Sequence, residues 1–140
     1  MRAILFAFNL LLISGVLHSQ PDTKVFRDHI SENKVQILKD FRELLAMPNV
    51  AYDLPNIQKN ANYIVEQLQE RGVDAKLLRM VGTPPIVYGY LPVEGTTRTL
   101  ALYVHYDGQP VDKSRWSQDP WDPTLFSRAM DEGGTPIEWP

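Results

Sequence analysis

Residues 99–104, TLALYV, form a nearly continuous apolar run, and the string HYDGQPV follows it at residues 105–111. A strand that is buried on both faces has such a run, whereas a half-buried strand alternates apolar and polar residues. We therefore expect residues 99–104 to form the central strand of a sheet. Open α/β sheets bind their ligands at the carboxyl ends of the strands, so His105 lies where binding and catalytic residues are usually found.

Two helices are predicted before this strand. Over residues 25–45 the apolar side chains recur at gaps of three, four and seven, which predicts a helix with one apolar stripe that ends before Pro48. A second amphipathic helix is expected over residues 55–71, with Asp53 as its N-cap and Gly72 in the left-handed conformation just beyond its end.

Two shorter strands are predicted between the second helix and the buried run. Residues 75–80 and 86–91 have strand patterns, and the turn-forming string GTPP separates them. Glu94 and Gly95 form the next turn. The order helix, helix, strand, strand, strand predicts an α/β fold in which helices pack on a mixed, largely buried sheet.

The composition excludes several classes of protein. The chain has 140 residues, of which 44% are hydrophobic and 22% charged, which fits one domain at most and neither a disordered chain nor a bundle of membrane spans. Its net charge is −3, so it has no basic footprint for nucleic acid, and we expect no nucleic-acid partner. The absence of cysteine excludes disulfides, thiolate metal ligands and a cysteine nucleophile.

The first 19 residues have the pattern of a secretory signal peptide. Arg2 supplies one positive charge, an apolar run extends to Leu17, and polar residues begin at His18. We expect cleavage after Ser19 and export to the periplasm or the extracellular space. An uncleaved anchor is the alternative, but the run is shorter than the roughly 20 residues that a span needs. No stable membrane span is expected after cleavage.

His105 and Asp107 are the candidate site residues. Neutral imidazole is a common zinc ligand, and a nearby carboxylate can support a metal site by orienting the ring. In an extended chain, the spacing of two residues places both side chains on the same side. A surface histidine that pairs with an aspartate by chance is the alternative for these two residues alone.

A longer string resembles a known family. The apolar strand, His105-Tyr106-Asp107, Pro110, Trp116 and the segment DPWDP at residues 119–123 resemble the zinc-dependent exopeptidases and deacylases. This family includes carnosinase-like dipeptidases, aminoacylase, acetylornithine deacetylase and glutamate carboxypeptidase. The resemblance extends over roughly residues 25–126, and Gln109 before the proline is closer to the dipeptidase-like branch.

The resemblance implies a metal-dependent hydrolase. It makes His105 a ligand to one of two zinc ions and Asp107 a catalytic acidic neighbour that orients the site; cobalt or manganese would suit the same ligands. In such an enzyme the metals activate a water that attacks the amide carbonyl of a dipeptide, a short peptide or an N-acyl amino acid. The resemblance also implies a homodimer formed through a further domain. Substrate-binding residues are not assigned.

Most of the site that the resemblance implies is expected beyond this sequence. The bridging Asp, the general-base Glu and the remaining ligands follow the matching region in the family, so residues 20–140 are expected to be the N-terminal part of the catalytic domain and inactive alone. Asp131 and Glu132 lack the pattern of the bridging residues. We interpret His29 as a solvated helix residue. Carboxylates beside prolines commonly form turns or caps, and we interpret three in that way: Asp112, Asp119 and Asp122.

Two other functions remain open at this stage. An exported binding module without catalytic activity would use its tryptophans, Trp116, Trp121 and Trp139, to stack on sugars or peptides. A remnant of the family would keep the fold but have lost the catalytic residues. The tryptophans of the Pro-rich loop also have a plainer interpretation as packing residues.

Overall fold

The computed structural model describes residues 23–140, so the predicted signal peptide lies outside the described residues. The chain divides within its first helix into one part that ends at Glu32 and a second part from Asn33 to Pro140. Each part is considered by itself, and the elements that carry the candidate site all belong to the second.

The first predicted helix is confirmed as α1, Thr23–Leu45. It ends three residues before Pro48, as expected from the restriction that proline places on the residue before it. Its apolar stripe is predicted correctly, but no residue of α1 is buried. Phe26 is 62% exposed in the first part, and Phe41 is 52% exposed in the second.

The second predicted helix is confirmed as α2, Leu54–Glu70. The Asp53 side chain accepts a hydrogen bond from the Asn56 backbone N–H at 3.3 Å, so Asp53 is the N-cap, as predicted. Beyond the end of the helix, Gly72 has a φ of 79°, which is the left-handed conformation expected there. Three residues of α2 are buried: Ile57, Asn60 and Ala61.

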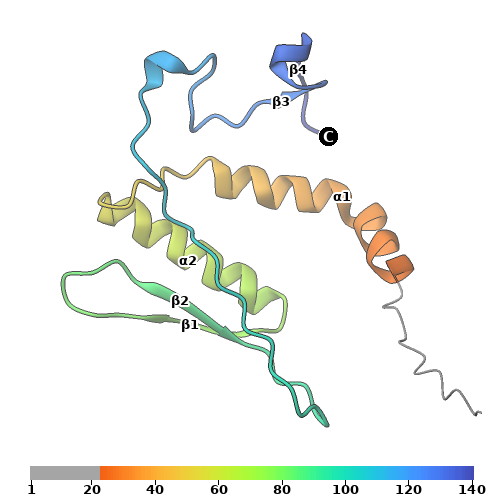
Figure 1. Ribbon diagram of the computed structural model, residues 1–140, viewed down its shortest axis with the longest axis vertical. Coiled ribbons are helices and arrows are strands. Elements are labelled where there is room, and N and C mark those ends of the chain that lie inside the picture. Colours follow the sequence, from red (N-terminus) through yellow and green to blue (C-terminus); the bar gives the residue numbers. More distant parts are fainter. Residues whose placement is uncertain (1–22) are drawn as a thin grey trace, which may run out of the picture. The chain divides into compact units, whose positions relative to one another are not determined.

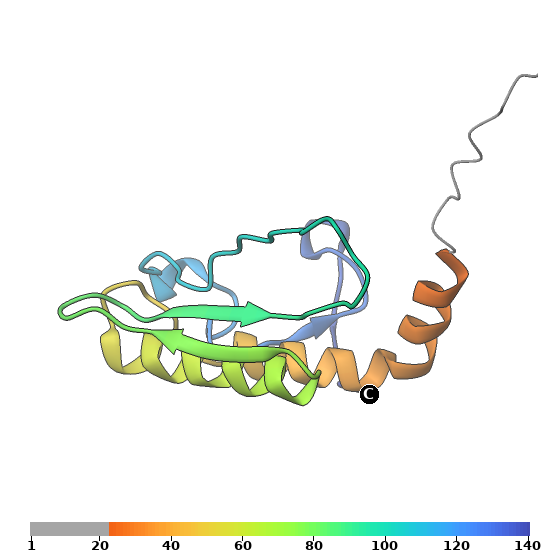
Figure 2. The same cartoon turned by 90° about the horizontal axis from the view of Figure 1, so that it is seen from below.

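The two short strands form an antiparallel pair. β1, Asp74–Leu78, pairs with β2, Ile86–Tyr90, in a register that places Ala75 opposite Gly89 and Leu77 opposite Val87. Both strands contact α2, and Figures 1 and 2 show the pair alongside that helix. Ala75 is buried, whereas most of the other strand residues are exposed. The core of the second part is therefore the face between α2 and this pair.

The predicted central strand at residues 99–104 is wrong. In the described residues this segment belongs to no strand, and Figure 2 shows it as an extended connection beyond β2. Leu100 and Leu102 are each 83% exposed and Val104 is 81% exposed. A buried strand needs a hydrogen-bonded neighbour and cover on both faces, and residues 23–140 supply neither to this segment.

The irregular C-terminal stretch is held by short local contacts. Two short 3₁₀ helices, η1 (Lys113–Arg115) and η2 (Met130–Glu132), alternate with β3 (Leu125–Phe126) and β4 (Pro136–Ile137). β3 and β4 form a second antiparallel pair. The fold is thus a mixture of helices and strands, as predicted at that level, but its sheets are antiparallel pairs and largely exposed. Among residues 23–140, none of the helices combines the length and the apolar character that crossing a bilayer requires.

We predict that Ile57→Ala will lower the free energy of unfolding by about 2–4 kcal/mol, because Ile57 is fully buried and its truncation leaves a cavity at the buried face of α2. Denaturant unfolding followed by circular dichroism measures this change. Leu54→Ala is the matched control, since Leu54 begins the same helix and is 49% exposed. Equal losses in the two variants would contradict the location of the core.

Candidate functional site

The side chains of His105 and Asp107 lie together. Nδ1 of His105 is 3.3 Å from Oδ1 of Asp107, and the two side chains are 72% and 42% exposed. The ring of Tyr103 meets the His105 ring edge to face, with the ring centres 5.2 Å apart. The side chains of residues 103, 105 and 107 therefore share one side of an extended segment, which confirms the geometry expected from a spacing of two residues.

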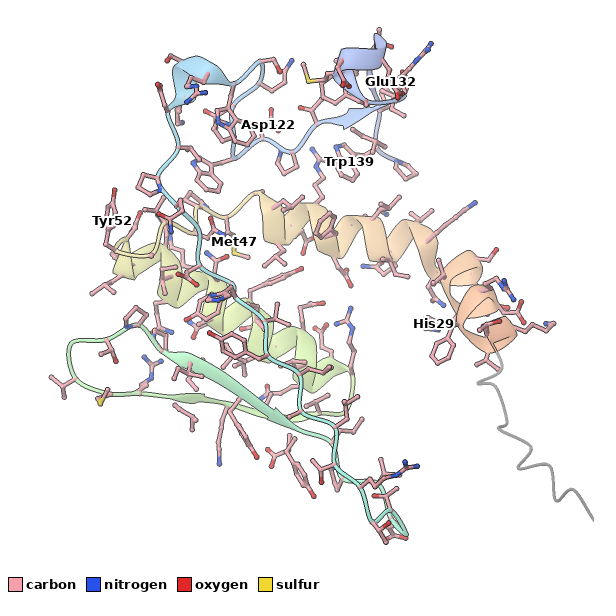
Figure 3. The ribbon with its side chains drawn as sticks, in the orientation of Figure 1. His29, Met47, Tyr52, Asp122, Glu132 and Trp139 are labelled. Atoms are coloured by element: carbon pink, nitrogen blue, oxygen red, sulfur yellow. The ribbon has the colours of Figure 1, made fainter. Side chains whose placement is uncertain are left out.

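The connection between α1 and α2 holds the end of this segment. Val50 and Gly108 form a parallel bridge, in which the Gly108 N–H donates to the Asn49 carbonyl at 2.7 Å. The Ala51 N–H donates in turn to the Gly108 carbonyl at 3.0 Å. Met47 and Tyr52, labelled in Figure 3, belong to this connection. Backbone hydrogen bonds thus fix Gly108, one residue after Asp107.

The side chain of Asn49 adds a second contact to the same segment. Its Nδ2 donates to the Tyr106 carbonyl at 3.2 Å. The amide lies so close to Gly108 that a Cβ at that position would be 2.7 Å from Asn49 Oδ1, well inside van der Waals contact. A residue with a side chain at 108 would therefore displace Asn49.

The connection is itself tied to α2 by a buried amide. Asn60 is 1% exposed, and its Nδ2 donates to the Pro48 carbonyl at 2.8 Å and to the Asn56 carbonyl at 2.9 Å. A buried amide without such partners would be costly. The core helix therefore positions the loop that holds the His-Asp segment.

Tyr106 turns its side chain away from the pair. Its hydroxyl donates to the carbonyl of Pro85, a buried residue just before β2. Burial, followed by the charge of Asp107, raises the pKa of Tyr106 above its usual value, so the phenol remains a neutral donor at physiological pH. This contact links the segment to the strand pair.

The described residues do not complete a metal centre. An imidazole with a carboxylate on its Nδ1 is a suitable donor, because Nε2 then carries the lone pair that a metal needs. A catalytic zinc takes about three protein ligands and an open position. Within residues 23–140, no three His, Cys, Asp or Glu side chains group closely enough to hold a metal ion. The His105–Asp107 pair could therefore supply one ligand of such a centre, together with the carboxylate that orients it.

Two other carboxylates of the polar C-terminal stretch serve local structure, as predicted. Asp112 caps η1, and hydrogen bonds from the hydroxyl and the backbone N–H of Ser114 lower its pKa. A hydrogen bond from Lys113, followed by one from the Trp121 N–H, lowers the pKa of Asp119. Figure 3 shows Asp122 and Glu132 on separate turns of this stretch.

The three tryptophans differ in their exposure and contacts. The Trp139 indole N–H donates to the Pro123 carbonyl at 3.0 Å, and the Arg42 guanidinium lies 5.2 Å from its ring centre. Trp121 is half-buried, whereas Trp116 is 54% exposed. Of the three tryptophans, Trp116 is therefore the most exposed.

Two surface hollows lie near these elements, with volumes of about 310 and 370 Å³. The first is mainly apolar and lies between α1 and α2. The second lies beside the turn between β1 and β2 and includes Pro85, which accepts the hydrogen bond from Tyr106. Neither hollow is lined by His105 or Asp107, so neither identifies a substrate-binding residue.

Sequence reasoning did not identify Asn49 or Asn60 as parts of the site. Each asparagine is ordinary for its local position, one after a helix and the other within one. The contact between Asn49 and Gly108 joins residues 59 positions apart, and no local pattern predicts such a pairing.

Comparisons with known proteins identify relatives over most of the chain. No protein-family model matches the chain, and no solved structure matches it. It is 29% identical over 136 residues to the Cys-Gly metallodipeptidase DUG1 of Candida albicans, an alignment that covers 80% of this chain and 28% of the relative. It is 27% identical over 130 residues to the Cys-Gly metallodipeptidase dug1 of Schizosaccharomyces pombe, covering 79% of this chain and 27% of the relative.

The chain thus spans little more than a quarter of the length of these two curated relatives. The similarity supports the expected relationship to metal-dependent peptidases. The particular branch, the identity and number of the metal ions, and the roles of His105 and Asp107 stay predictions.

We predict that residues 1–140 expressed alone will hydrolyse no dipeptide and bind no zinc tightly, because the described residues bring together too few ligands. Equilibrium dialysis with zinc, followed by a dipeptide assay with added zinc, cobalt or manganese, measures both properties. Turnover that a chelator abolishes and metal restores would refute the prediction.

Proposed function

We propose that this chain belongs to an exported metal-dependent hydrolase, in which residues 20–140 form the first part of the catalytic domain. The enzyme cleaves the amide bond of dipeptides, short peptides or N-acyl amino acids. The observation that carries the proposal is the anchored His105–Asp107 pair, whose nitrogen and carboxylate have the chemistry of a metal-supporting pair. The similarity to two metallodipeptidases supports the same reaction class.

In this proposal His105 contributes Nε2 as a metal ligand. Asp107 accepts a hydrogen bond from the Nδ1–H group, which fixes the tautomer and the orientation of the ring. The metal, proposed to be a pair of zinc ions, supplies Lewis acidity and an activated water when bound; cobalt and manganese suit the same donors. The pair is exposed in the described residues, so a metal there remains accessible to a substrate.

The proposed substrates are small molecules with one amide bond close to a free terminus. Because both similar proteins are named Cys-Gly metallodipeptidases, Cys-Gly is the first substrate to test. We also propose that the whole protein forms a homodimer, and that nucleic acid is not among its partners. The acidic net charge of −3 agrees with the second statement.

We predict that His105→Ala in the whole protein will lower kcat/KM for Cys-Gly by about 100-fold or more and will reduce bound metal. Removing the hydrogen-bond partner of a metal ligand commonly lowers activity or metal affinity by about 10- to 100-fold, and removing the ligand itself should lower them further. Metal content by mass spectrometry and steady-state kinetics measure the two effects. The matched control is His29→Ala, which removes an imidazole from α1 and should leave the metal content and kcat/KM unchanged. Unchanged kinetics and metal content in His105→Ala would overturn the proposed function.

We predict that the exported protein will begin at Gln20, because the apolar run before it has the length of a signal peptide. N-terminal sequencing of the protein recovered outside the cytoplasm tests this directly. Leu11→Arg, which places a charge in the middle of the run, should leave the protein uncleaved. Native protein recovered outside the cytoplasm with an intact Met1 would contradict the prediction.

A further inference from the structure

Asn49 forms hydrogen bonds with the peptide groups on both sides of Asp107. The carbonyl of Tyr106 belongs to the peptide group before Asp107, and it accepts from Asn49 Nδ2 at 3.2 Å. The N–H of Gly108 belongs to the peptide group after Asp107, and it donates to the Asn49 carbonyl at 2.7 Å. One residue thus holds the two peptide groups whose orientations set the backbone angles of Asp107.

These two hydrogen bonds fix the backbone at Asp107 and therefore the direction of its carboxylate. The segment before it belongs to no strand, and Leu100, Tyr103 and Val104 are all more than 80% exposed. In the described residues no sheet ladder therefore orients residues 105–107. Because the peptide groups on both sides of Asp107 are hydrogen-bonded to Asn49, the backbone angles of Asp107 are fixed, and in this conformation its carboxylate meets His105 Nδ1 at 3.3 Å.

Asn49 is in turn fixed by the core. The loop that carries it is tied to α2 through Asn60, which is 1% exposed and donates to the Pro48 carbonyl at 2.8 Å. Gly108 completes the fit, since a Cβ there would lie 2.7 Å from Asn49 Oδ1. A continuous set of contacts therefore runs from the buried face of α2 to the exposed His-Asp pair.

We propose that Asn49 is the positioning residue of the His105–Asp107 pair. It holds the backbone of Asp107 so that the carboxylate keeps the proton of His105 on Nδ1 and leaves the lone pair on Nε2. This role rests on the proposed function, in which Nε2 of His105 serves as a ligand. Asn49 itself touches neither substrate nor metal in this proposal.

Imidazole ¹⁵N chemical shifts of the intact chain, recorded without metal at about pH 8, report which nitrogen of the neutral ring carries the proton. We expect the Nδ1–H tautomer at His105 in the native chain and a mixture typical of free histidine in Asn49→Ala. Hydrogen exchange of the Gly108 amide should accelerate about tenfold, while the amides of α2 keep their protection. His29 provides a reference histidine in the same spectrum.

Three further variants separate positioning from a general loss of structure. Gly108→Ala should give the same tautomer change although Asn49 is present, because its Cβ displaces the amide. Asp107→Ala should lose the Nδ1–H preference and keep the slow exchange at Gly108. Asn62→Ala is the matched control, since Asn62 is an exposed asparagine of α2 that accepts from Gln58 at 2.8 Å, and it should change neither signal.

The outcomes distinguish this inference from the proposed function. A native tautomer and a native exchange rate of the residue 108 amide in both Asn49→Ala and Gly108→Ala would overturn the positioning role. The effect of His105→Ala on metal and kinetics would stand independently. If His105→Ala leaves hydrolysis unchanged, the proposed function fails and the positioning role for that reaction fails with it, whatever the tautomer shows. A tautomer change accompanied by loss of α2 protection would assign Asn49 a general structural role and would also overturn the inference.

Discussion

The hydrogen bond from the Gly108 N–H to the Asn49 carbonyl, 2.7 Å long, is the contact on which the arrangement of the candidate site depends. It joins the connection between the two helices to a segment that lies 59 residues further along the chain. Between β2 and η1, the parallel bridge around this bond is the only strand-like pairing that the described residues show. Because a single bridge gains little against the entropy of ordering its residues, the neighbouring contacts of Asn49 and Tyr106 are needed to hold it.

The anchor for these contacts is α2. Its buried face supplies Ile57 and Ala61 to the core and Asn60 to the loop, so one helix both packs on the strand pair and positions the connection before it. The hydroxyl of Tyr106 provides a second link, to the buried Pro85 ahead of β2. The segment that carries His105 is thus tied to both components of the core, although its own side chains are mostly exposed.

Most apolar side chains of α1 stay exposed because the contacts of this helix with α2 that are described here are polar. The polar contacts of Asp40 join α1 to α2: its carbonyl accepts from Tyr63 at 2.9 Å, and its carboxylate accepts from Arg71 at 2.6 Å. A hydrogen bond from Gln36, together with Arg71, lowers the pKa of Asp40, so the carboxylate remains charged at physiological pH. These partly exposed polar contacts join residues 33–45 of α1 to α2, but Ile37, Phe41 and Leu45 stay more than 40% exposed.

The sequence by itself determined the local elements of this protein: both helices with the Asp53 cap and the left-handed Gly72, both strands of the first pair, and the approach of His105 to Asp107. Each depends on periodicity, capping or spacing over a few residues, and such effects act within the segment itself. The apolar run at residues 99–104 was predicted wrongly, because apolar character describes what a segment needs and not whether a neighbouring strand is present to supply it. Only the tertiary structure decided that Asn49 and Asn60 support the site, since their partners are carbonyls and amides of the backbone, which every residue type carries alike.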